Sequence, residues 1–431
     1  MSKPYWRSPD DLADTPALRA LAAREFPGFA NVYEGTGEAE PEEGDGPTRR
    51  QFLTLSAAAL GLAGAAGCRR PDFEILPYNR LPEDVVFGLP VYYATTIPRP
   101  GGGFPVLVES HTGRPTKVEG NPSHPAGGGA TDAHAQASVF DLYAPARGGG
   151  VLHNGRPVPW QDFDAFAAGH FARLQAAGGK GLRFLAEDVP SPSLRKLRAH
   201  IAEKFPQSAW HVYEPVGDAN SRRGAAIAFG KPYRAGYRLD KAKRILAIDC
   251  DLLGLDPSAV VHARHFAAGR RAEDPGEMNR LYAVETTYTV TGMSADHRLR
   301  LPGSHVADYV VALARHLLPD VPAPAPNVAI PREWVEEVAA DLRAHKGAGL
   351  ICVGERQPAF VHALAHRLNE HLGNLGATVE LRPVEEGQTS SIDELAAAID
   401  GGEVQTLVIL GGNPAYDAPA SLDLAAKLSR V

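Results

Sequence analysis

Two histidines four residues apart are the first candidates for chemistry. His362 and His366 have the spacing at which one helix face presents two imidazoles to a zinc ion, but Ala363 stands where a metalloprotease carries its glutamate. The apolar residues of the same helix form a stripe of Phe360, Leu364, Leu368 and Leu372. The helical repeat puts the two histidines on the opposite, solvent-facing side of this stripe. We therefore expect no metal ion at this pair.

Cysteine and serine give no catalytic site either. The chain has three cysteines, Cys68, Cys250 and Cys352, too few for an iron–sulfur cluster, which needs about four thiolates, or for a disulfide scaffold. Cys250 and Cys352 each lie at or in an apolar strand, where cysteine usually acts as a small hydrophobic residue. Ser294 follows Gly292 but lacks the second glycine of a hydrolase nucleophile elbow. We expect no catalytic residue.

A glycine-rich turn is the best candidate for ligand binding. The apolar strand predicted at 406–410 runs directly into Gly411-Gly412-Asn413-Pro414. Such a turn can offer backbone N–H groups and an asparagine side chain to a phosphate. The same residues are also typical of an ordinary turn. Gly412 and Asn413 are therefore candidates for a remnant of a cofactor-binding site.

The segment 48–68 resembles an export signal with a lipid-attachment site. Arg49 and Arg50 precede Phe52 and Leu53, and an Ala- and Gly-rich run follows, as in a twin-arginine signal. The run ends at Cys68, after small residues typical of a bacterial lipobox. The alternative is an alanine-rich buried helix with a chance arginine pair. We expect export by the twin-arginine route and lipidation of Cys68.

The overall composition excludes several classes of protein. The chain has 431 residues and a formal net charge of −7, so no global basic field favours nucleic acid or anionic lipid. No apolar stretch reaches the roughly 20 residues of a membrane-spanning helix. Hydrophobic residues make up 44% of the chain, which is the usual content of a globular protein.

The elements that would position these residues alternate between strand and helix. We expect strands at 182–186, 210–214, 244–249, 281–287, 350–354, 378–382 and 406–410, and helices at 192–204, 308–318, 332–345, 358–372 and 392–400. This alternation predicts an α/β fold of mostly parallel sheets covered by helices. Before it, residues 106–119 read as a hairpin with its turn at 111–114, in a β-rich N-terminal region.

The same signals divide the chain into four parts. We expect an N-terminal leader at 1–47, the twin-arginine h-region at 48–67, a β-rich domain at 68–150 and an α/β region at 151–431. The last helix begins soon after a strand and stops without a following strand, so we expect the α/β region to be incomplete.

Several of these segments together resemble the molybdopterin oxidoreductases with a variant twin-arginine leader. They include the leader from Met1 to Gly28, the segment 48–68, the hairpin with Gly120-Asn121-Pro122, and Gly412-Asn413-Pro414. The family includes the B subunit of bacterial alternative complex III, a quinol-oxidising respiratory complex, whose N-terminal molybdopterin-like part this chain resembles. The resemblance implies a molybdopterin-oxidoreductase-like fold across nearly the whole chain.

The chain differs from the family at the residues that serve the iron–sulfur cluster and electron transfer. The resemblance aligns the last cluster cysteine with Asp132, and His134 takes the place of a lysine associated with electron transfer. The ferredoxin-like part that carries the family's iron–sulfur clusters is also absent from this sequence. These departures imply a molybdenum-enzyme fold that holds no metal and no cofactor of its own.

The resemblance therefore implies a non-catalytic structural subunit, or a fragment of one, in an alternative complex III-like assembly. Its expected place is the periplasmic face of the bacterial inner membrane, attached through a lipid on Cys68. Its expected partners are other subunits of the respiratory complex, including an iron–sulfur ferredoxin-like part, and not nucleic acid. One alternative is a molybdopterin-dependent oxidoreductase that lost only its cluster, with Asn413 contacting the cofactor. Another is an exported lipoprotein that binds a small ligand at the carboxyl edge of its sheet.

Overall fold

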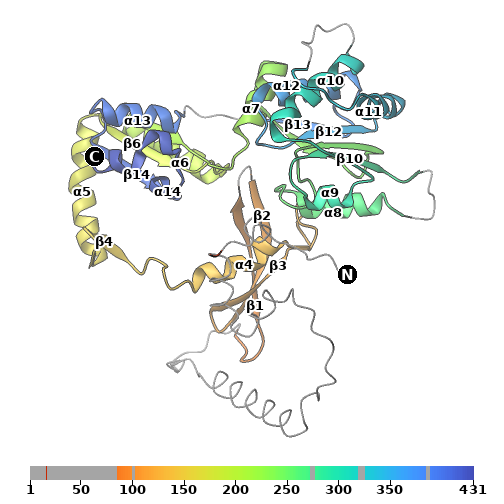
Figure 1. The fold of residues 1–431 in the computed structure, drawn as a ribbon. Coiled ribbons are helices and arrows are strands. Elements are labelled where there is room, and N and C mark those ends of the chain that lie inside the picture. The colour runs from red at the N-terminus through yellow and green to blue at the C-terminus, as the bar shows by residue number, and fades with distance from the viewer. Residues whose placement is uncertain (1–15, 17–84, 100–101, 272–276, 319–325, 385–388) are drawn as a thin grey trace. The chain divides into compact units, whose positions relative to one another are not determined.

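The computed structural model describes Pro16 and residues 85–99, 102–271, 277–318, 326–384 and 389–431 (Figure 1). All of these except Pro16 belong to one compact unit, Pro82–Val431. The expected export signal and Cys68 lie outside the described residues. No helix in the described ranges is both long enough and apolar enough to cross a membrane.

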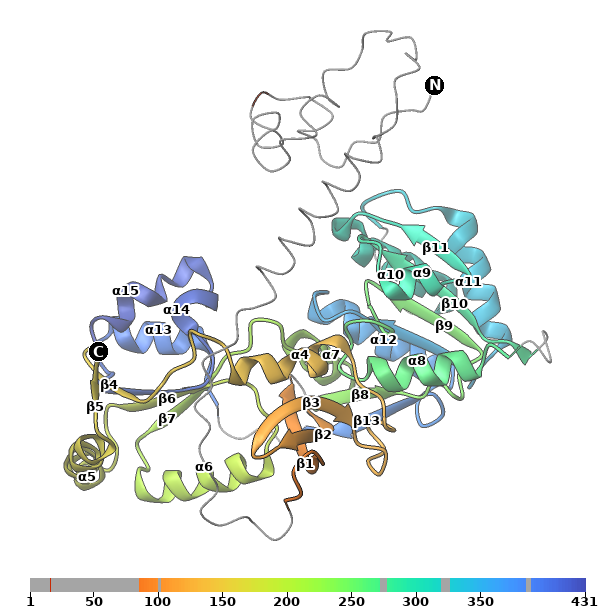
Figure 2. The same ribbon diagram turned by 90° about the horizontal axis from the view of Figure 1, so that it is seen from below.

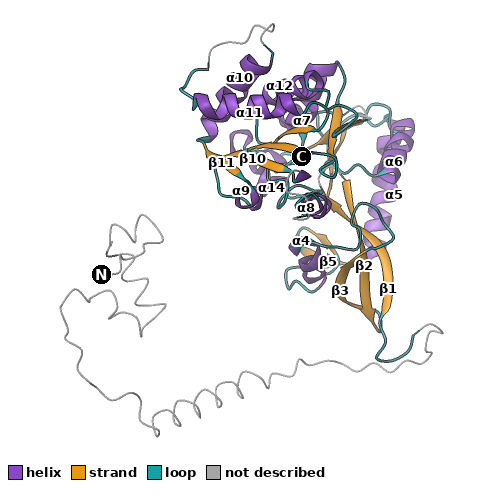
Figure 3. Ribbon diagram, turned by 90° about the vertical axis from the view of Figure 1, so that its right-hand side faces the viewer, coloured by secondary structure: helices purple, strands orange, loops and turns teal. Residues whose placement is uncertain are grey.

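The first described region is an antiparallel sheet of three strands (Figure 3). The strands are β1 (Val91–Arg99), β2 (Gly102–His111) and β3 (Arg114–Gly120). The turn between β2 and β3 has positive φ at both Thr112 (50°) and Gly113 (80°), as tight hairpin turns require. The predicted hairpin is therefore confirmed. The short helix α4 (Ala133–Ala137) and a 3-10 turn (Ser138–Leu142) follow, and Ala135 and Val139 pack on Phe104, Val106 and Val118.

A parallel three-stranded sheet is built from two distant parts of the chain. Its order is β14 (Thr406–Leu410), β6 (Leu182–Ala186), β7 (Ala209–Val212). Apolar side chains cover both faces, so neither face can be left to solvent. Helices α5 (Trp160–Ala176) and α6 (Pro192–Lys204) pack on one face, and α13 (Ile392–Asp400) and α15 (Leu424–Leu428) on the other. Ser391 and Glu394 form a capping box that fixes the start of α13.

A second parallel sheet is formed by the residues between β7 and β14. Its order is β11 (His297–Arg300), β10 (Arg280–Glu285), β9 (Arg244–Ile248), β12 (Gly349–Val353). Helices α10 (Val306–Leu317), α11 (Arg332–Ala344) and α12 (Ala359–His371) cover one face (Figure 2). Phe266 of α8 (Ala259–Ala268) packs in the core on the other face. The chain leaves β9 toward β10 on one side and returns to β12 on the other, so a topological switch point lies between β9 and β12.

The remaining elements are shorter or were not expected. Strands β4 (Val151–His153) and β5 (Arg156–Val158) form a small hairpin, and α7 (Ala219–Phe229) packs along α12. The strand expected at 378–382 is β13 (Val379–Pro383), but it pairs antiparallel with β8 (Tyr233–Tyr237). The short helices α9 (Val290–Ser294) and α14 (Pro414–Asp417) and the 3-10 turns Gly303–His305 and Ala420–Leu422 complete the set. The predicted α/β class with mostly parallel sheets is confirmed.

Candidate functional site

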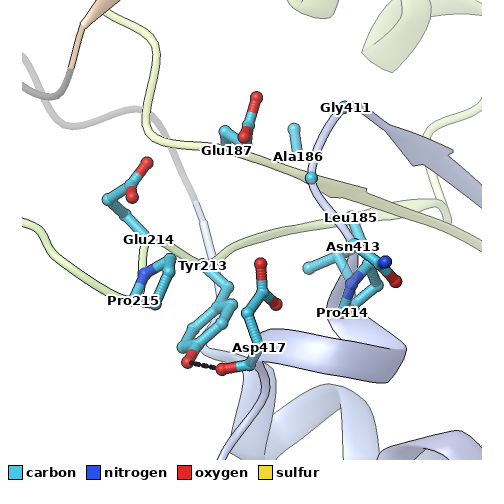
Figure 4. Close-up of a pocket in the computed structure, with 11 residues that line it drawn as sticks. Leu185, Ala186, Glu187, Tyr213, Glu214, Pro215, Gly411, Asn413, Pro414 and Asp417 are labelled. Atoms are coloured by element: carbon cyan, nitrogen blue, oxygen red, sulfur yellow. Dashed lines mark hydrogen bonds between the residues drawn. The ribbon is translucent and has the colours of Figure 1, made fainter. Parts of the chain in front are cut away.

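A hollow lies at the carboxyl edge of the three-stranded parallel sheet (Figure 4). It has an empty volume of about 340 Å³, part of which is open to solvent. Its lining comes from the residues at and just after the ends of β6, β7 and β14, and from α14. These residues are Leu185, Ala186, Glu187, Tyr213, Glu214, Pro215, Gly411, Gly412, Asn413, Pro414 and Asp417.

The sheet topology explains why the hollow forms there. β6 is followed by β7 on one side, and β14 joins β6 on the other side only after the second parallel sheet has been completed. The loops that leave β6 and β14 therefore diverge. Crevices at such switch points are the usual ligand sites of open α/β sheets. This candidate site is called the β6/β14 pocket below.

The glycine turn after β14 has a backbone conformation that favours glycine at two successive positions. Gly411 and Gly412 have φ angles of +75° and +65°, a region that L side chains rarely adopt. A glutamate from the neighbouring strand end lies against this turn. A Cβ atom added to Gly411 would come within 2.6 Å of Glu187 Oε2, and one added to Gly412 within 3.4 Å of Glu187 Cγ. The carboxylate of Glu187 thus lies directly against the glycine turn.

The lining of the pocket is acidic. Glu187, Glu214 and Asp417 line it, and no lysine, arginine or histidine is among the lining residues. Partial burial raises the pKa of Glu214, and the negative charges of Glu187 and Asp417 raise it further. Burial and the charges of Asp417 and Glu214 raise the pKa of Tyr213. Negative charge is therefore already crowded at this edge of the sheet.

Asp417 combines a hydrogen-bonded backbone with a buried carboxylate oxygen that has no donor among the described residues. Tyr213 holds its backbone, because the phenol donates a hydrogen bond of 2.7 Å to the Asp417 carbonyl oxygen (Figure 4). The carboxylate atom Oδ1 of Asp417 is buried and accepts no hydrogen bond from any described residue. A buried carboxylate oxygen without a donor is costly.

The β6/β14 pocket does not match the needs of a molybdopterin. That cofactor carries a phosphate, which proteins bind with backbone N–H groups, helix N-termini and cationic side chains. The Gly411-Gly412 turn can supply backbone N–H groups. The cationic side chains are missing from the lining, and three carboxylates stand in their place. At an effective dielectric constant of about 20, each carboxylate within 4 Å of a phosphate charge would oppose binding by about 4 kcal/mol.

The structure brings the predicted cofactor-binding candidates to this pocket but surrounds them with residues that the sequence did not single out. Gly412 and Asn413 line the pocket, and the Asn413 side chain does not cap α14. Glu187 and Glu214 were missed: Glu187 is the first residue after the predicted strand 182–186, and Glu214 is the last residue of the predicted strand 210–214. The first residue after a strand of a parallel sheet is the signal that could have found Glu187.

Asp132 has a structural role where the resemblance implies a cluster cysteine. Its carboxylate accepts two hydrogen bonds from Arg99, of 2.6 and 2.7 Å, and one of 2.8 Å from the backbone of Ala135 at the start of α4. The Arg99 guanidinium lowers the pKa of Asp132 below its usual range. His134 lies on α4 with an exposed side chain. Asp132 therefore fixes α4 to β1 as an N-cap and ion pair.

The expected position of the histidine pair is wrong. His362 and His366 are 4% and 6% exposed, whereas Phe360, expected in the core, is 51% exposed. The reason is that α12 is buried on two sides, because α7 packs on the face that the sequence pattern leaves to solvent. His366 packs against Phe229 of α7 at 5.5 Å between ring centroids. Within the described residues, no group of three or more potential ligands forms a metal site, at this pair or elsewhere.

Comparisons with known proteins give one sequence relative and weak structural neighbours. No protein-family model matches the chain. The menaquinone reductase, molybdopterin-binding-like subunit of Nitratidesulfovibrio vulgaris is 28% identical over 172 residues, which cover 38% of this chain and 24% of that protein. The match thus spans about a quarter of the length of that relative.

Two solved structures match the chain with low TM-scores. Acetylene hydratase from Pelobacter acetylenicus has a TM-score of 0.45 and 13% identity, over 65% of this chain and 43% of that one. The formyltransferase/hydrolase complex of Methylorubrum extorquens has a TM-score of 0.35 and 15% identity, over 60% of this chain and 61% of that one. The sequence relative supports the expected resemblance to molybdopterin-oxidoreductase-like proteins, but not the narrower assignment to the alternative complex III B subunit.

Proposed function

We propose that this protein is a non-catalytic structural subunit of a membrane-bound respiratory complex that reacts with quinones. The observation that carries the proposal is the acidic lining of the β6/β14 pocket. Glu187, Glu214 and Asp417 line the pocket together with the glycine turn, and Glu187 lies directly against that turn. The similarity to a molybdopterin-binding-like subunit of a menaquinone reductase supports the type of complex. The finer assignment, to an alternative complex III-like assembly, rests on the resemblance of the leader and the motifs.

The proposal includes a location and partners. Arg49, Arg50, Phe52 and Leu53 would direct export by the twin-arginine route, and Cys68 would carry a lipid at the periplasmic face of the inner membrane. A single acyl chain binds membranes only marginally, so other subunits would share the attachment. One of them would supply the iron–sulfur ferredoxin-like part. On this proposal, residues 1–47 and 48–67 precede the structural body, which comprises a β-rich domain at 68–150 and the α/β region at 151–431.

Exposed aromatic side chains support a role among protein partners. In α5, Trp160, Phe163 and Phe166 are 64%, 41% and 59% exposed, and of the helix's residues only Leu174 is buried. Spacing of three residues puts the three rings near one another on the helix. Aromatic clusters of this kind are typical of protein interfaces and unusual on the surface of a monomer.

One observation favours a second function. The positive φ angles of Gly411 and Gly412, at a topological switch point, are what a molybdopterin oxidoreductase without its cluster would retain. In that case Asn413 would contact the cofactor. We rank this function second because the pocket supplies carboxylates where a phosphate needs cations.

Purification from native membranes tests the proposal. We expect a tagged chain, extracted in mild detergent, to elute with quinone-reactive membrane subunits and an iron–sulfur subunit, identified by mass spectrometry and iron content. An untagged strain and a strain with a tagged unrelated lipoprotein are the controls. Elution of the chain alone, from membranes in which the other subunits are detected, would contradict the role as a subunit.

A further inference from the structure

Cys250 and Cys352 meet at the switch point of the second parallel sheet, although 101 residues separate them in the sequence. Cys352 lies in β12, opposite Ala247 of β9. Just after β9, Asp249 adopts a positive φ of 47°, and the Gly354 N–H donates a 2.9 Å hydrogen bond to the Ile248 carbonyl. The chain therefore turns toward the end of β12 instead of continuing along β9.

The turn brings the backbone of Cys250 against the residue that follows β12. A Cβ atom added to Gly354 would lie 1.8 Å from the Asp249 carbonyl oxygen and 3.3 Å from Cys250 Cα. Gly354 is two residues beyond Cys352. The close approach of Cys250 to Gly354 therefore brings the two cysteines into the same small region at the ends of β9 and β12. Only glycine can occupy position 354 at this approach.

The two cysteines pack in one shared apolar cluster. Cys352 is buried and Cys250 is half-buried, and both pack with Leu252 and Tyr237. The neighbouring Cys352 thiol and burial both raise the pKa of the Cys250 thiol. Both sulfur atoms are also close enough to Tyr237 to raise the pKa of its phenol, after the larger effect of burial. The Cys352 Sγ also donates to the Leu246 carbonyl oxygen at 3.4 Å.

We propose that Cys250 and Cys352 form a reversible intramolecular disulfide. Cys250 is the attacking residue because Cys352 is buried. Its thiolate attacks one sulfur of an oxidant disulfide, and one thiol leaves. The Cys352 thiolate then attacks the Cys250 sulfur of this mixed disulfide, and the second thiol leaves. The two cysteines lose two protons and two electrons in total, and the oxidant disulfide is reduced to two thiols.

The bridge would join the ends of β9 and β12 across the switch point. A link between two elements already in contact removes loop freedom from the unfolded chain without a new native contact. The oxidised protein should therefore unfold at a higher temperature than the reduced protein. The exchange should also be slow at neutral pH, because the raised pKa of the attacking Cys250 thiol leaves little thiolate.

The test uses the full chain with Cys68→Ser, so that Cys250 and Cys352 are its two remaining cysteines. The protein is incubated with oxidised glutathione at about pH 8.5, where more thiolate forms, then denatured and treated with a maleimide. We expect no alkylated thiol, a mass about 2 Da below the reduced chain from the two hydrogen atoms lost, and two alkylated thiols after dithiothreitol. Peptide mapping should recover Cys250 linked to Cys352.

Matched single variants identify the pair. Cys352→Ser should accumulate a glutathione adduct on Cys250, because no second thiol is present to release it. Cys250→Ser should keep one thiol that is alkylated only after denaturation. Two alkylated thiols in the oxidised parent chain, a lasting glutathione adduct on it, or disulfide-linked dimers would each overturn the proposal. If a serine variant fails to fold, the mass and peptide map of the parent chain still decide the outcome.

Discussion

The Gly224→Ala substitution is expected to destabilise the protein by about 2 kcal/mol, although alanine is the better helix former by about 1 kcal/mol. Gly224 lies inside α7, where it packs against α12. A Cβ atom at this position would come within 2.4 Å of His362 Cβ and 2.6 Å of the Ala359 carbonyl oxygen. Neither atom is the end of a flexible side chain, so the two helices must move apart. Urea unfolding monitored by circular dichroism measures the change.

The same substitution at Gly169 is the matched control and should have the opposite sign. Gly169 lies inside α5 and is exposed, and the nearest atom to an added Cβ is Arg173 Nη1 at 3.9 Å. Gly169→Ala should therefore stabilise the protein by about 0.5–1 kcal/mol. Equal effects at the two sites would contradict the close packing of α7 on α12.

The buried histidine pair should make the protein lose roughly 3 kcal/mol of stability between pH 7 and pH 5. Burial lowers the pKa of both His362 and His366 to about 4, and the charge of His366 contributes to the lowered pKa of His362. The folded chain therefore keeps both rings neutral while the unfolded chain binds protons below pH 6.5. The contribution of the pair is complete above pH 6.5 and is lost as the pH falls toward 4.

Comparison of variants isolates this effect from other titrations. Glu355 acts in the opposite direction, because burial and the charges of Asp218 and Asp256 raise its pKa to about 8, and the folded state gains stability as the pH falls below that value. The double variant His362→Gln/His366→Gln keeps Glu355 and should lose only the pair's share of the pH dependence. His371→Gln, on the exposed side of the same helix, should keep the parent profile. A double variant with the parent profile would contradict the burial of the pair.

The sequence predicts the strands best where a mostly apolar run ends at a charged pair or a turn. β6 and β14 have the predicted bounds, 182–186 and 406–410, because β6, with Arg183 as its one charged residue, ends at Glu187-Asp188, and the apolar run of β14 ends at Gly411-Gly412. Helices α6 and α13 also have their predicted bounds, since Pro192 and Ser391 are strong start signals. These elements follow from local rules.

The acidic character of the pocket could not be predicted, because it depends on pairing between distant strands. Tyr213 and Asp417 are 204 residues apart, and only the position of β14 beside β6 brings them together. The predicted strand 210–214 also extends past the real end of β7 at Val212, and so hides Glu214 inside a strand. Glu187 approaches Gly411 only in the folded sheet.

The histidine pair shows a second limit of sequence patterns. A periodic apolar stripe identifies one buried face of α12, and the pattern then assigns the other face to solvent. α7 covers that second face with Gly224 and Phe229, which carry no periodic signal of their own. The two histidines are buried there as neutral rings, and the burial of a polar residue type cannot be predicted from hydropathy.

Molybdenum and pterin analysis tests the central claim, that the carboxylates of the β6/β14 pocket exclude a cofactor phosphate, most directly. The full chain is purified from a host that makes the molybdenum cofactor, with a molybdoenzyme from the same cells as the positive control. Molybdenum is measured by mass spectrometry, and pterin by the fluorescence of its oxidised form. We predict that both are at background, and that they stay there when the protein is purified with its partners. Stoichiometric molybdenum and pterin would contradict the account and favour the second function, a molybdopterin-dependent oxidoreductase.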